Sequence, residues 1–256
     1  MAEYTFDEQA ADRAVNFIEK FCTHVKGELA GKPFLLEQWQ KDDIIRPLFG
    51  WKDEHGLRRY RTCYVEIPRK NGKSNLSAAI ALYMLFADGE PGAEIISAAG
   101  DRGQASIVFD IAKDMISNNV HLQQRARVLR NLIKYKTSWY KSISAEAYTK
   151  HGLNCHAVVF DELHTQPNRE LWDVLRTSQG ARRQPLTIAL TTAGHDRSSI
   201  CYEVHEYAIN VRDGILKDDT FLPVLYCADK DDDWTKEETW KKANPGYGTI
   251  CLKSYF

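Results

Sequence analysis

The sequence contains 256 residues, of which 43% are hydrophobic and 27% are charged, so it can bury one large core or a core with a small appendage. Its formal net charge of −1 offers nucleic acid no general attraction, so such a partner would have to meet a local basic patch. There is no apolar N-terminal segment and no CxxC pair among the six cysteines, which predicts a reducing, cytoplasmic setting without a membrane.

Helical patterns dominate the first fifty residues. Thr5 and Glu8 have the spacing of a capping box, and apolar residues follow at helical spacing within 5–29. A second helix is predicted for LLEQWQKDDIIRPLFG, before a polar turn. We therefore expect residues 1–50 to form a helical region that packs on a core of residues 51–256.

Short apolar strands then alternate with helices. This pattern implies a mostly parallel sheet that helices cover on both faces. The segment 125–148, rich in basic and aromatic residues, interrupts the alternation as a β-hairpin or a twisted excursion. Strands are predicted at 62–67, 94–99, 156–160, 186–191 and 221–226, and helices are predicted to start near Lys73, Gln104 and Asn168.

The stretch YVEIPRKNGKSNLSAAI, residues 64–80, has the parts of a phosphate loop. Such a loop needs a strand, a turn of exposed backbone N–H groups, a Lys for the β/γ-phosphates, a Ser or Thr for Mg²⁺, and a helix N-terminus. The first glycine of GxxxxGK[ST] falls at Ile67, so the strict pattern fails, although Pro68 could fix the start of the turn. Taken alone, the stretch could equally be an ordinary turn. The candidate nucleotide-binding residues of the loop are Pro68, Arg69, Lys70, Asn71, Gly72, Lys73, Ser74 and Asn75.

A second signal is the sequence HAVVFDELH, in which an apolar strand runs directly into Asp161 and Glu162. Two carboxylates at the end of a buried strand are costly without a partner, and Mg²⁺ would be such a partner. Asp161 would then hold the metal beside Ser74, while Glu162 would orient and deprotonate the water that attacks the γ-phosphate. The alternative is a strand end with both acids in solvent, which the preceding loop makes less favoured.

A third signal follows the strand LTIAL. Thr191, Thr192, Ala193 and Gly194 are small or hydroxylated residues that could contact a γ-phosphate or its attacking water and report hydrolysis to the fold. Alone this signal is weak, because strands often end in Thr and Gly.

With these elements in order, the chain resembles the ATPase domain of the large terminase subunit of tailed bacteriophages. The resemblance is carried by PFLLEQWQ, IPRKNGKS, SAAGDRGQAS, HGLNCHAVVFDELH and LTTAG, and it spans roughly residues 30–250. The family commonly lacks the first glycine of the loop and carries a basic residue within it. The resemblance implies an α/β P-loop NTPase of the additional-strand (ASCE) class, with a mostly parallel sheet between two helical layers.

Residue by residue, the resemblance implies that Lys73 and Ser74 contact phosphate and Mg²⁺, that Asp161 holds the metal, and that Glu162 is catalytic. It assigns the segment from Thr191 to Gly194 to coupling. It also suggests that Gln40 contacts adenine, although a solvated helix position is an equal alternative.

An arginine is expected at the developing γ-phosphate charge. Arg69 lies within the loop and could act in cis. Arg102, in the polar loop GDRGQ, could reach the neighbouring subunit, and we favour it as the arginine supplied in trans.

The implied function is Mg²⁺-dependent ATP hydrolysis that moves double-stranded DNA into a procapsid, in the host cytoplasm. The implied partners are the portal protein, a small terminase subunit and further copies of the chain in a ring, by analogy a pentamer. The nuclease domain of full-length large terminases is not expected here, because the chain ends at Phe256.

Two other functions compete with this one. A helicase-like remodelling ATPase would need a second lobe. A nucleotide-gated assembly module without turnover would have no need of Glu162.

Other polar groups are set aside. The spacing of the histidines and cysteine near the acidic strand fits no common zinc site. The basic segment 125–141 could contact DNA phosphates or a neighbouring subunit, but a solvated face is the favoured interpretation. The residues considered as zinc ligands are His151, Cys155, His156 and His164. The sequence does not rank the further basic positions as DNA contacts; these are Arg169, Arg176, Arg182 and Arg183.

Overall fold

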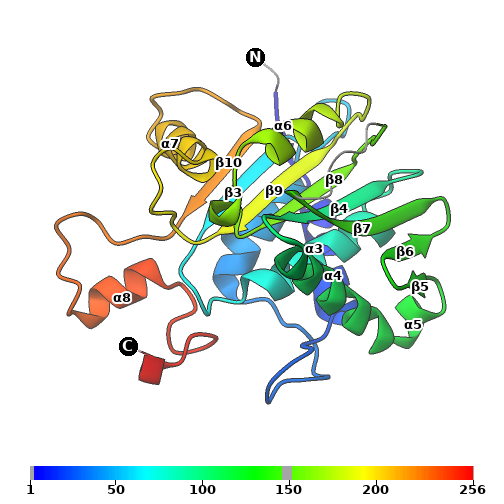
Figure 1. Ribbon diagram of the computed structural model, residues 1–256, viewed down its shortest axis with the longest axis horizontal. Coiled ribbons are helices and arrows are strands. Elements are labelled where there is room, and N and C mark those ends of the chain that lie inside the picture. Colours follow the sequence, from blue (N-terminus) through cyan, green and yellow to red (C-terminus); the bar gives the residue numbers. More distant parts are fainter. Residues whose placement is uncertain (1–2, 146–151, 256) are drawn as a thin grey trace.

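A computed structural model describes residues 3–145 and 152–255, and an eight-stranded sheet runs through its centre (Figure 1). The strand order is β10-β3-β9-β8-β4-β7-β6-β5, and a separate two-stranded sheet joins β1 to β2. The strands are β1 (Thr5–Phe6), β2 (Trp51–Lys52), β3 (Thr62–Glu66), β4 (Glu94–Ala99), β5 (Arg127–Leu129), β6 (Leu132–Tyr135), β7 (Ser138–Ser144), β8 (Ala157–Asp161), β9 (Leu186–Thr191) and β10 (Phe221–Leu225).

The pairing within the sheet confirms the predicted class. From β10 to β7 every neighbouring pair in this sheet is parallel, whereas β7 pairs with β6, and β6 with β5, in the antiparallel sense. Strand β9 lies between β3, which leads into the phosphate loop, and β8, which ends in the carboxylates. This inserted strand is the feature expected of the additional-strand class.

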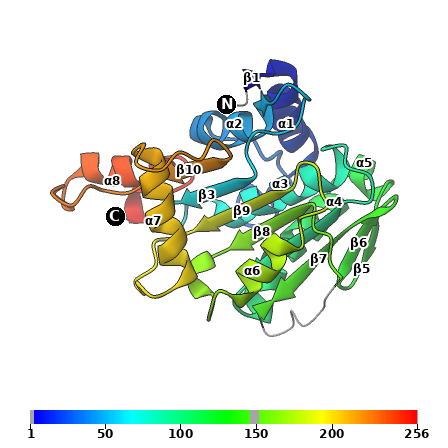
Figure 2. The same ribbon diagram turned by 90° about the horizontal axis from the view of Figure 1, so that it is seen from above.

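Helices cover both faces of the sheet, as Figure 2 shows. Helices α6 and α7 lie on one face, whereas α3 and α4 lie on the other with α1 and α2 outside α3. No helix within the described ranges is both long and apolar enough to cross a membrane. The helices are α1 (Glu8–Phe21), η1 (Gln40–Ile45), α2 (Arg46–Gly50), α3 (Lys73–Phe86), α4 (Arg102–Ser117), α5 (Val120–Gln123), η3 (Leu163–Thr165), α6 (Glu170–Thr177), α7 (Ile200–Arg212), α8 (Glu237–Ala243) and η4 (Lys253–Tyr255).

Burial explains why these segments form strands and helices. All five residues of β3 and all five of β8 are buried, as expected for parallel strands covered on both faces. Helix α3 is also buried along most of its length, and its alanines let it pack closely between the sheet and α1. Two apolar clusters result, one on each side of the sheet.

The N-terminal region differs from its prediction in detail. The capping box at Thr5 is wrong, because Thr5 pairs with Lys52 in the small sheet and Asp7 caps α1 by accepting from the Ala10 N–H. The second helix is shorter than predicted and begins with the π-helical turn η1. A division at residue 50 remains a proposal, and β1 pairs with β2 across that boundary.

The segment after α5 forms a three-stranded extension of the sheet. Strands β5 and β6 form an antiparallel hairpin, and β7 joins it to the parallel part by pairing with β4. The hairpin alternative is therefore confirmed up to Ala145, and the remainder of the 125–148 prediction lies outside the described residues. Helix α7, which the sequence patterns did not single out, covers the opposite end of the sheet.

A buried ionic cluster joins the far ends of the strands to α3. Asp88 accepts from Arg58 Nη1 at 2.8 Å and lies 2.6 Å from His156 Nε2, and all three side chains are at most 5% exposed. Burial alone would raise the pKa of Asp88, but Arg58 and His156 hold it far below its ordinary value. The carboxylate is therefore ionised at neutral pH and compensates a buried guanidinium.

We predict that Asp88→Asn lowers the free energy of unfolding by about 3–5 kcal/mol, because it leaves Arg58 charged and unpaired in the interior. Urea unfolding at neutral pH measures this change. Asp219→Asn is the matched control, since Asp219 meets Arg59 at the surface and its loss should cost less than about 1 kcal/mol. Equal effects of the two substitutions would contradict the prediction.

Candidate functional site

A cavity of about 710 Å³ opens where β3, β8 and the start of α3 meet, at the carboxyl edge of the parallel strands. This edge is where open parallel sheets bind ligands. The cavity gathers basic, hydroxyl and carboxylate groups from segments far apart in the sequence. Its lining residues are Lys26, Arg69, Lys70, Gly72, Lys73, Ser74, Asn75, Gln104, Glu162, His164 and Thr165.

The loop between β3 and α3 has the backbone of an anion-binding turn. Lys70 and Gly72 both have positive φ angles, 69° and 78°, and Gly72 immediately precedes the first residue of α3. Glycine adopts this conformation without the strain that a Cβ atom brings. The helix N-terminus and its free N–H groups therefore face the cavity, as a phosphate site requires.

Asn71 holds this loop from behind. Its amide donates to Pro68 O and Arg69 O and to Asn244 Oδ1, and its Oδ1 accepts from the Gly246 N–H at 3.1 Å. Because the side chain is fully buried in these contacts, it fixes the loop and does not line the cavity.

Lys73 lies at the floor of the site with 6% of its surface exposed. Its ammonium contacts Ile67 O and Pro68 O at 3.3 Å each and Glu162 Oε1 at 3.5 Å. Burial lowers the pKa of Lys73, and the two neighbouring carboxylates partly oppose that shift. The ammonium is held by groups that a phosphate could replace.

Asp161 ends β8 beside the first turn of α3. Its Oδ2 lies 3.5 Å from Ser74 Oγ and accepts from Gln104 Nε2 at 3.0 Å, while its Oδ1 is buried without a hydrogen-bond partner. Burial, followed by the charge of Glu162, raises the pKa of Asp161 to about 6. A carboxylate with one oxygen beside a hydroxyl and the other left unpartnered among the described residues fits Mg²⁺, which commonly takes one or two protein ligands and keeps waters and phosphate oxygens.

Glu162 is held in a conformation that non-glycine residues rarely adopt. Its φ is 53° and its ψ is 60°, which turns its side chain into the cavity beside Lys73. Its Oε2 accepts from the Thr192 N–H at 3.3 Å and lies 3.2 Å from His164 Nδ1. Burial would raise its pKa, but His164, Lys73 and the Thr192 N–H outweigh burial and lower it. Glu162 is therefore the more acidic member of the carboxylate pair.

The end of β9 contacts this carboxylate directly. Thr192 Oγ1 lies 3.4 Å from Glu162 Oε2, and Thr191 Oγ1 lies 3.1 Å from His164 Nδ1. Gly194 passes close to His164, where an added Cβ would lie 3.3 Å from the histidine Cβ. Ala193 is exposed and makes no contact of this kind within the described residues.

The family profile described as "Terminase large subunit, ATPase domain" matches residues 38–210, which include the loop, both carboxylates and the β9 end. The chain belongs to this family. Membership of this ATPase family implies that the chain binds a nucleotide.

Relatives agree with the assignment. The large terminase subunit of Enterobacteria phage HK97 is 32% identical over 247 residues, covering 93% of this chain and 47% of the relative. The protein YmfN of Escherichia coli (strain K12) is 35% identical over 104 residues, covering 41% of this chain and 23% of the relative. The crystal structure of the HK97 large terminase superposes with a TM-score of 0.82 at 28% identity, covering 96% of this chain and 50% of that chain. The terminase domain described here thus spans about half the length of its HK97 relative.

Gln40 is not a solvated helix residue. It is fully buried in the π-helical turn η1, and its Oε1 accepts from the Glu37 N–H. Its Nε2 has no hydrogen-bond partner and lies 3.8 Å from where a Cβ on Gly72 would be. A buried, unused donor beside the phosphate loop supports the adenine contact as a proposal.

The two candidate arginines lie in different cavities. Arg69 lines the nucleotide cavity, whereas Arg102, at the start of α4, lines a separate cavity beside β7. Of these two arginines, Arg69 lines the same cavity as Glu162 and Arg102 does not, so the trans role of Arg102 stays a prediction.

Sequence reasoning missed several residues of the site. Gln104 and His164 contact the two carboxylates, and Lys26 lines the cavity from the N-terminal region. Gln104 lies within the family motif SAAGDRGQAS, but the sequence assigns it no role of its own, and His164 is considered from the sequence only as a zinc ligand. No group of three or more His, Cys, Asp or Glu residues in the described ranges can hold a metal, while His151 lies outside those ranges. Nothing in the sequence pointed to Asn244 as the anchor of the loop.

We predict that Asp161→Asn stabilises the protein in EDTA at pH 7.5 by about 3 kcal/mol. This free energy corresponds to the rise in the pKa of Asp161 from its ordinary value of 3.8 to about 6 in the folded protein. Since the folded-state pKa is raised, the cost of ionising Asp161 is complete above pH 6 and disappears below pH 3.8. The advantage of the variant should therefore shrink toward pH 4 in urea unfolding. Glu162→Gln should instead lower the free energy of unfolding at pH 7.5, because the folded protein lowers the pKa of Glu162 and so favours its ionised form. Asp161→Asn unfolding as easily as the parent at pH 7.5 would refute this.

Proposed function

We propose that this chain hydrolyses ATP at the cavity and that hydrolysis drives double-stranded DNA into a phage procapsid. One observation carries the proposal. A phosphate loop with a buried lysine, the Ser74 hydroxyl and the Glu162 carboxylate line one opening, and the buried Asp161 carboxylate lies beside that hydroxyl. This is the set of groups that in-line phosphoryl transfer to water requires.

Glu162 would take the proton of the attacking water. Its lowered pKa keeps the carboxylate ionised at neutral pH, the form that accepts a proton. Thr192 and His164 fix Oε2, so Oε1 is the oxygen left to face the cavity beside Lys73. When Lys73 turns to the phosphates, Oε1 loses its cation and is available to the water.

Ser74 and Asp161 would hold Mg²⁺, which neutralises the charge of the phosphate oxygens when bound. Gln104 donates to the Asp161 oxygen that faces Ser74 and so orients the carboxylate. The neighbouring backbone N–H groups of the loop and the α3 N-terminus would bind the nucleotide phosphates.

His164 and the β9 end would report the state of the nucleotide. His164 contacts Glu162, Thr191 and Thr192 at once, so any movement of the catalytic carboxylate alters bonds to β9. Strand β9 lies between β3 and β8 and continues toward α7, which places the signal in the centre of the sheet. In a motor this signal would be passed to DNA, to the portal protein and to neighbouring copies of the chain in a ring, for which we propose five copies. We further propose that a small terminase subunit delivers the DNA and that the motor acts in the host cytoplasm.

We expect Mg²⁺-dependent phosphate release from ATP, and a fall of about 10²–10⁴-fold in Glu162→Gln with ATP binding retained. Measuring release per chain over a range of concentrations also reveals a contribution from neighbours, since it should rise as chains associate. Glu203→Gln, an exposed carboxylate on α7, is the control. Turnover undiminished in Glu162→Gln would remove Glu162 as the base. ATP bound but never hydrolysed, with DNA and portal present, would favour an assembly switch.

The arginine assignments predict different results in mixed assemblies. If Arg102 acts in trans, Arg102→Ala chains bind ATP normally but lack turnover, and mixing them with Glu162→Gln chains restores it, because each supplies what the other lacks. If Arg69 acts in cis, Arg69→Ala chains lose turnover at every concentration and are not rescued by this mixing. Unchanged turnover in Arg102→Ala removes that residue from the mechanism.

A further inference from the structure

A second polar cavity, of about 770 Å³, lies on the other side of the first turn of α4. Arg102, Gly103 and Ser106 line it from α4, and Arg130 and Asn131 line it from the β5–β6 turn. The remaining wall is the last part of β7, from Lys141 to Ser144, together with Ala105 and Leu153.

The floor of this cavity has polar groups that no described residue satisfies. Ser144 is 3% exposed, and its Oγ is buried without a hydrogen-bond partner in residues 3–145 or 152–255. Among the described residues, β6 pairs with β7 only as far as Tyr140, so residues 141–144 are flanked by β4 on one side and have an open backbone edge on the other. A ligand with several acceptor oxygens would meet hydroxyl, backbone and cationic donors at this point.

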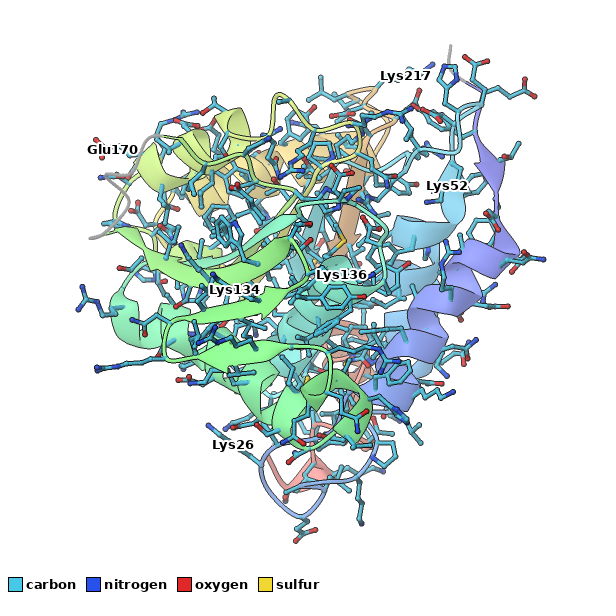
Figure 3. All side chains as sticks on the ribbon, turned by 90° about the vertical axis from the view of Figure 1, so that its right-hand side faces the viewer. Lys26, Lys52, Lys134, Lys136, Glu170 and Lys217 are labelled. Carbon is cyan, nitrogen blue, oxygen red and sulfur yellow. The ribbon has the colours of Figure 1, made fainter. Side chains whose placement is uncertain are left out.

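The surrounding surface is strongly basic. From Met115 to Ala145 the sequence has six Lys or Arg residues and no Asp or Glu, in a chain whose net charge is −1. All six side chains are exposed, and within residues 3–145 and 152–255 none of them forms an ion pair. Figure 3 looks onto this side of the molecule, where Lys134 and Lys136 lie on the strand extension. The six residues, named here the basic face, are Arg125, Arg127, Arg130, Lys134, Lys136 and Lys141.

We propose that the basic face and its cavity bind the phosphodiester backbone of nucleic acid. Unpaired Lys and Arg side chains on one surface are the electrostatic footprint of such binding. The centre of a protein interface is depleted of charged residues, whereas three cationic and three hydroxylated side chains are among the eleven residues that line this cavity. The continuation of the basic residues along β5 and β6 favours a polymer over a free anion. This inference rests on the proposed function and gives its DNA a place on the domain.

The position of α4 joins this surface to the nucleotide site. Asp101 caps the helix by accepting from the Gln104 N–H, and Gln104 in turn donates to Asp161 in the nucleotide cavity. Arg102 and Gly103, in the same turn, face the basic cavity. Nucleic acid that orders this turn would therefore also fix Gln104 against Asp161, so binding should stimulate hydrolysis.

The test uses the double variant Arg130→Ala/Lys141→Ala, which leaves every residue of the nucleotide cavity unchanged. At about 0.1 M salt each lost phosphate contact should weaken duplex binding about tenfold, and the salt dependence of log K should fall by about 2. DNA stimulation of hydrolysis should be lost, while basal turnover and the unfolding midpoint stay at parental values. The matched control is Lys217→Ala/Lys230→Ala, which removes the same charge from exposed sites near α7 and β10, with Lys217 well away from Lys134 and Lys136 in Figure 3.

Several outcomes would overturn the inference. Duplex affinity and salt dependence equal to those of the parent would do so, as would an equal loss in the control pair. Displacement of the duplex by inorganic phosphate at matched ionic strength would assign the cavity to a free anion. Loss of self-association with DNA binding intact would make the basic face a contact between copies. Because duplex binding is measured without ATP, a chain that binds DNA but never hydrolyses ATP would refute the proposed function and leave this inference standing.

Discussion

The desolvation of two adjacent carboxylates at the end of β8 is the constraint on which the site depends. Asp161 and Glu162 have the same chemistry, yet the fold gives them opposite protonation tendencies. Burial raises the pKa of Asp161 and leaves one of its oxygens unpartnered among the described residues, so a bound cation would stabilise the ionised carboxylate. Contacts with His164, Lys73 and Thr192 keep Glu162 ionised, which suits a base. A stable fold with these charges needs the parallel sheet that delivers both residues to one edge.

The strand order explains how the remaining parts reach that edge. Inserting β9 between β3 and β8 leaves a gap between the phosphate loop and the carboxylates, and the nucleotide cavity opens there. Directly after β9, Thr192 contacts Glu162 through both its N–H and its hydroxyl, while the Thr191 hydroxyl contacts His164. At the other side of β8, β4 brings α4 and Gln104 to Asp161. Three neighbouring strands thus position Glu162, its hydrogen-bond partner Thr192 and the Gln104 amide that contacts Asp161.

Much of this arrangement could be predicted from sequence because it depends on local patterns. The apolar runs before Lys73, Asp161 and Thr191 each mark a buried strand that ends in polar residues, and parallel strands bring such ends together. Contacts between distant segments left no such pattern. The capping of α1 by Asp7 was missed because the pairing of Thr5 with Lys52 decides it. Likewise, the role of His164 depends on the φ angle of Glu162, and the burial of Gln40 depends on a π-helical turn.

The contacts of Asn71 have a mechanical consequence. Its side chain links the phosphate loop to Asn244 and Gly246, which follow α8 and lie outside the layers of the sheet. A tension applied along the chain near Gly246 would reach the loop between Lys70 and Gly72 through these few bonds. A force on the segment after α8 and the affinity of the loop for a nucleotide would then be coupled through the hydrogen bonds of Asn71. In such a linkage the force that the molecule works against could alter how long it retains its nucleotide.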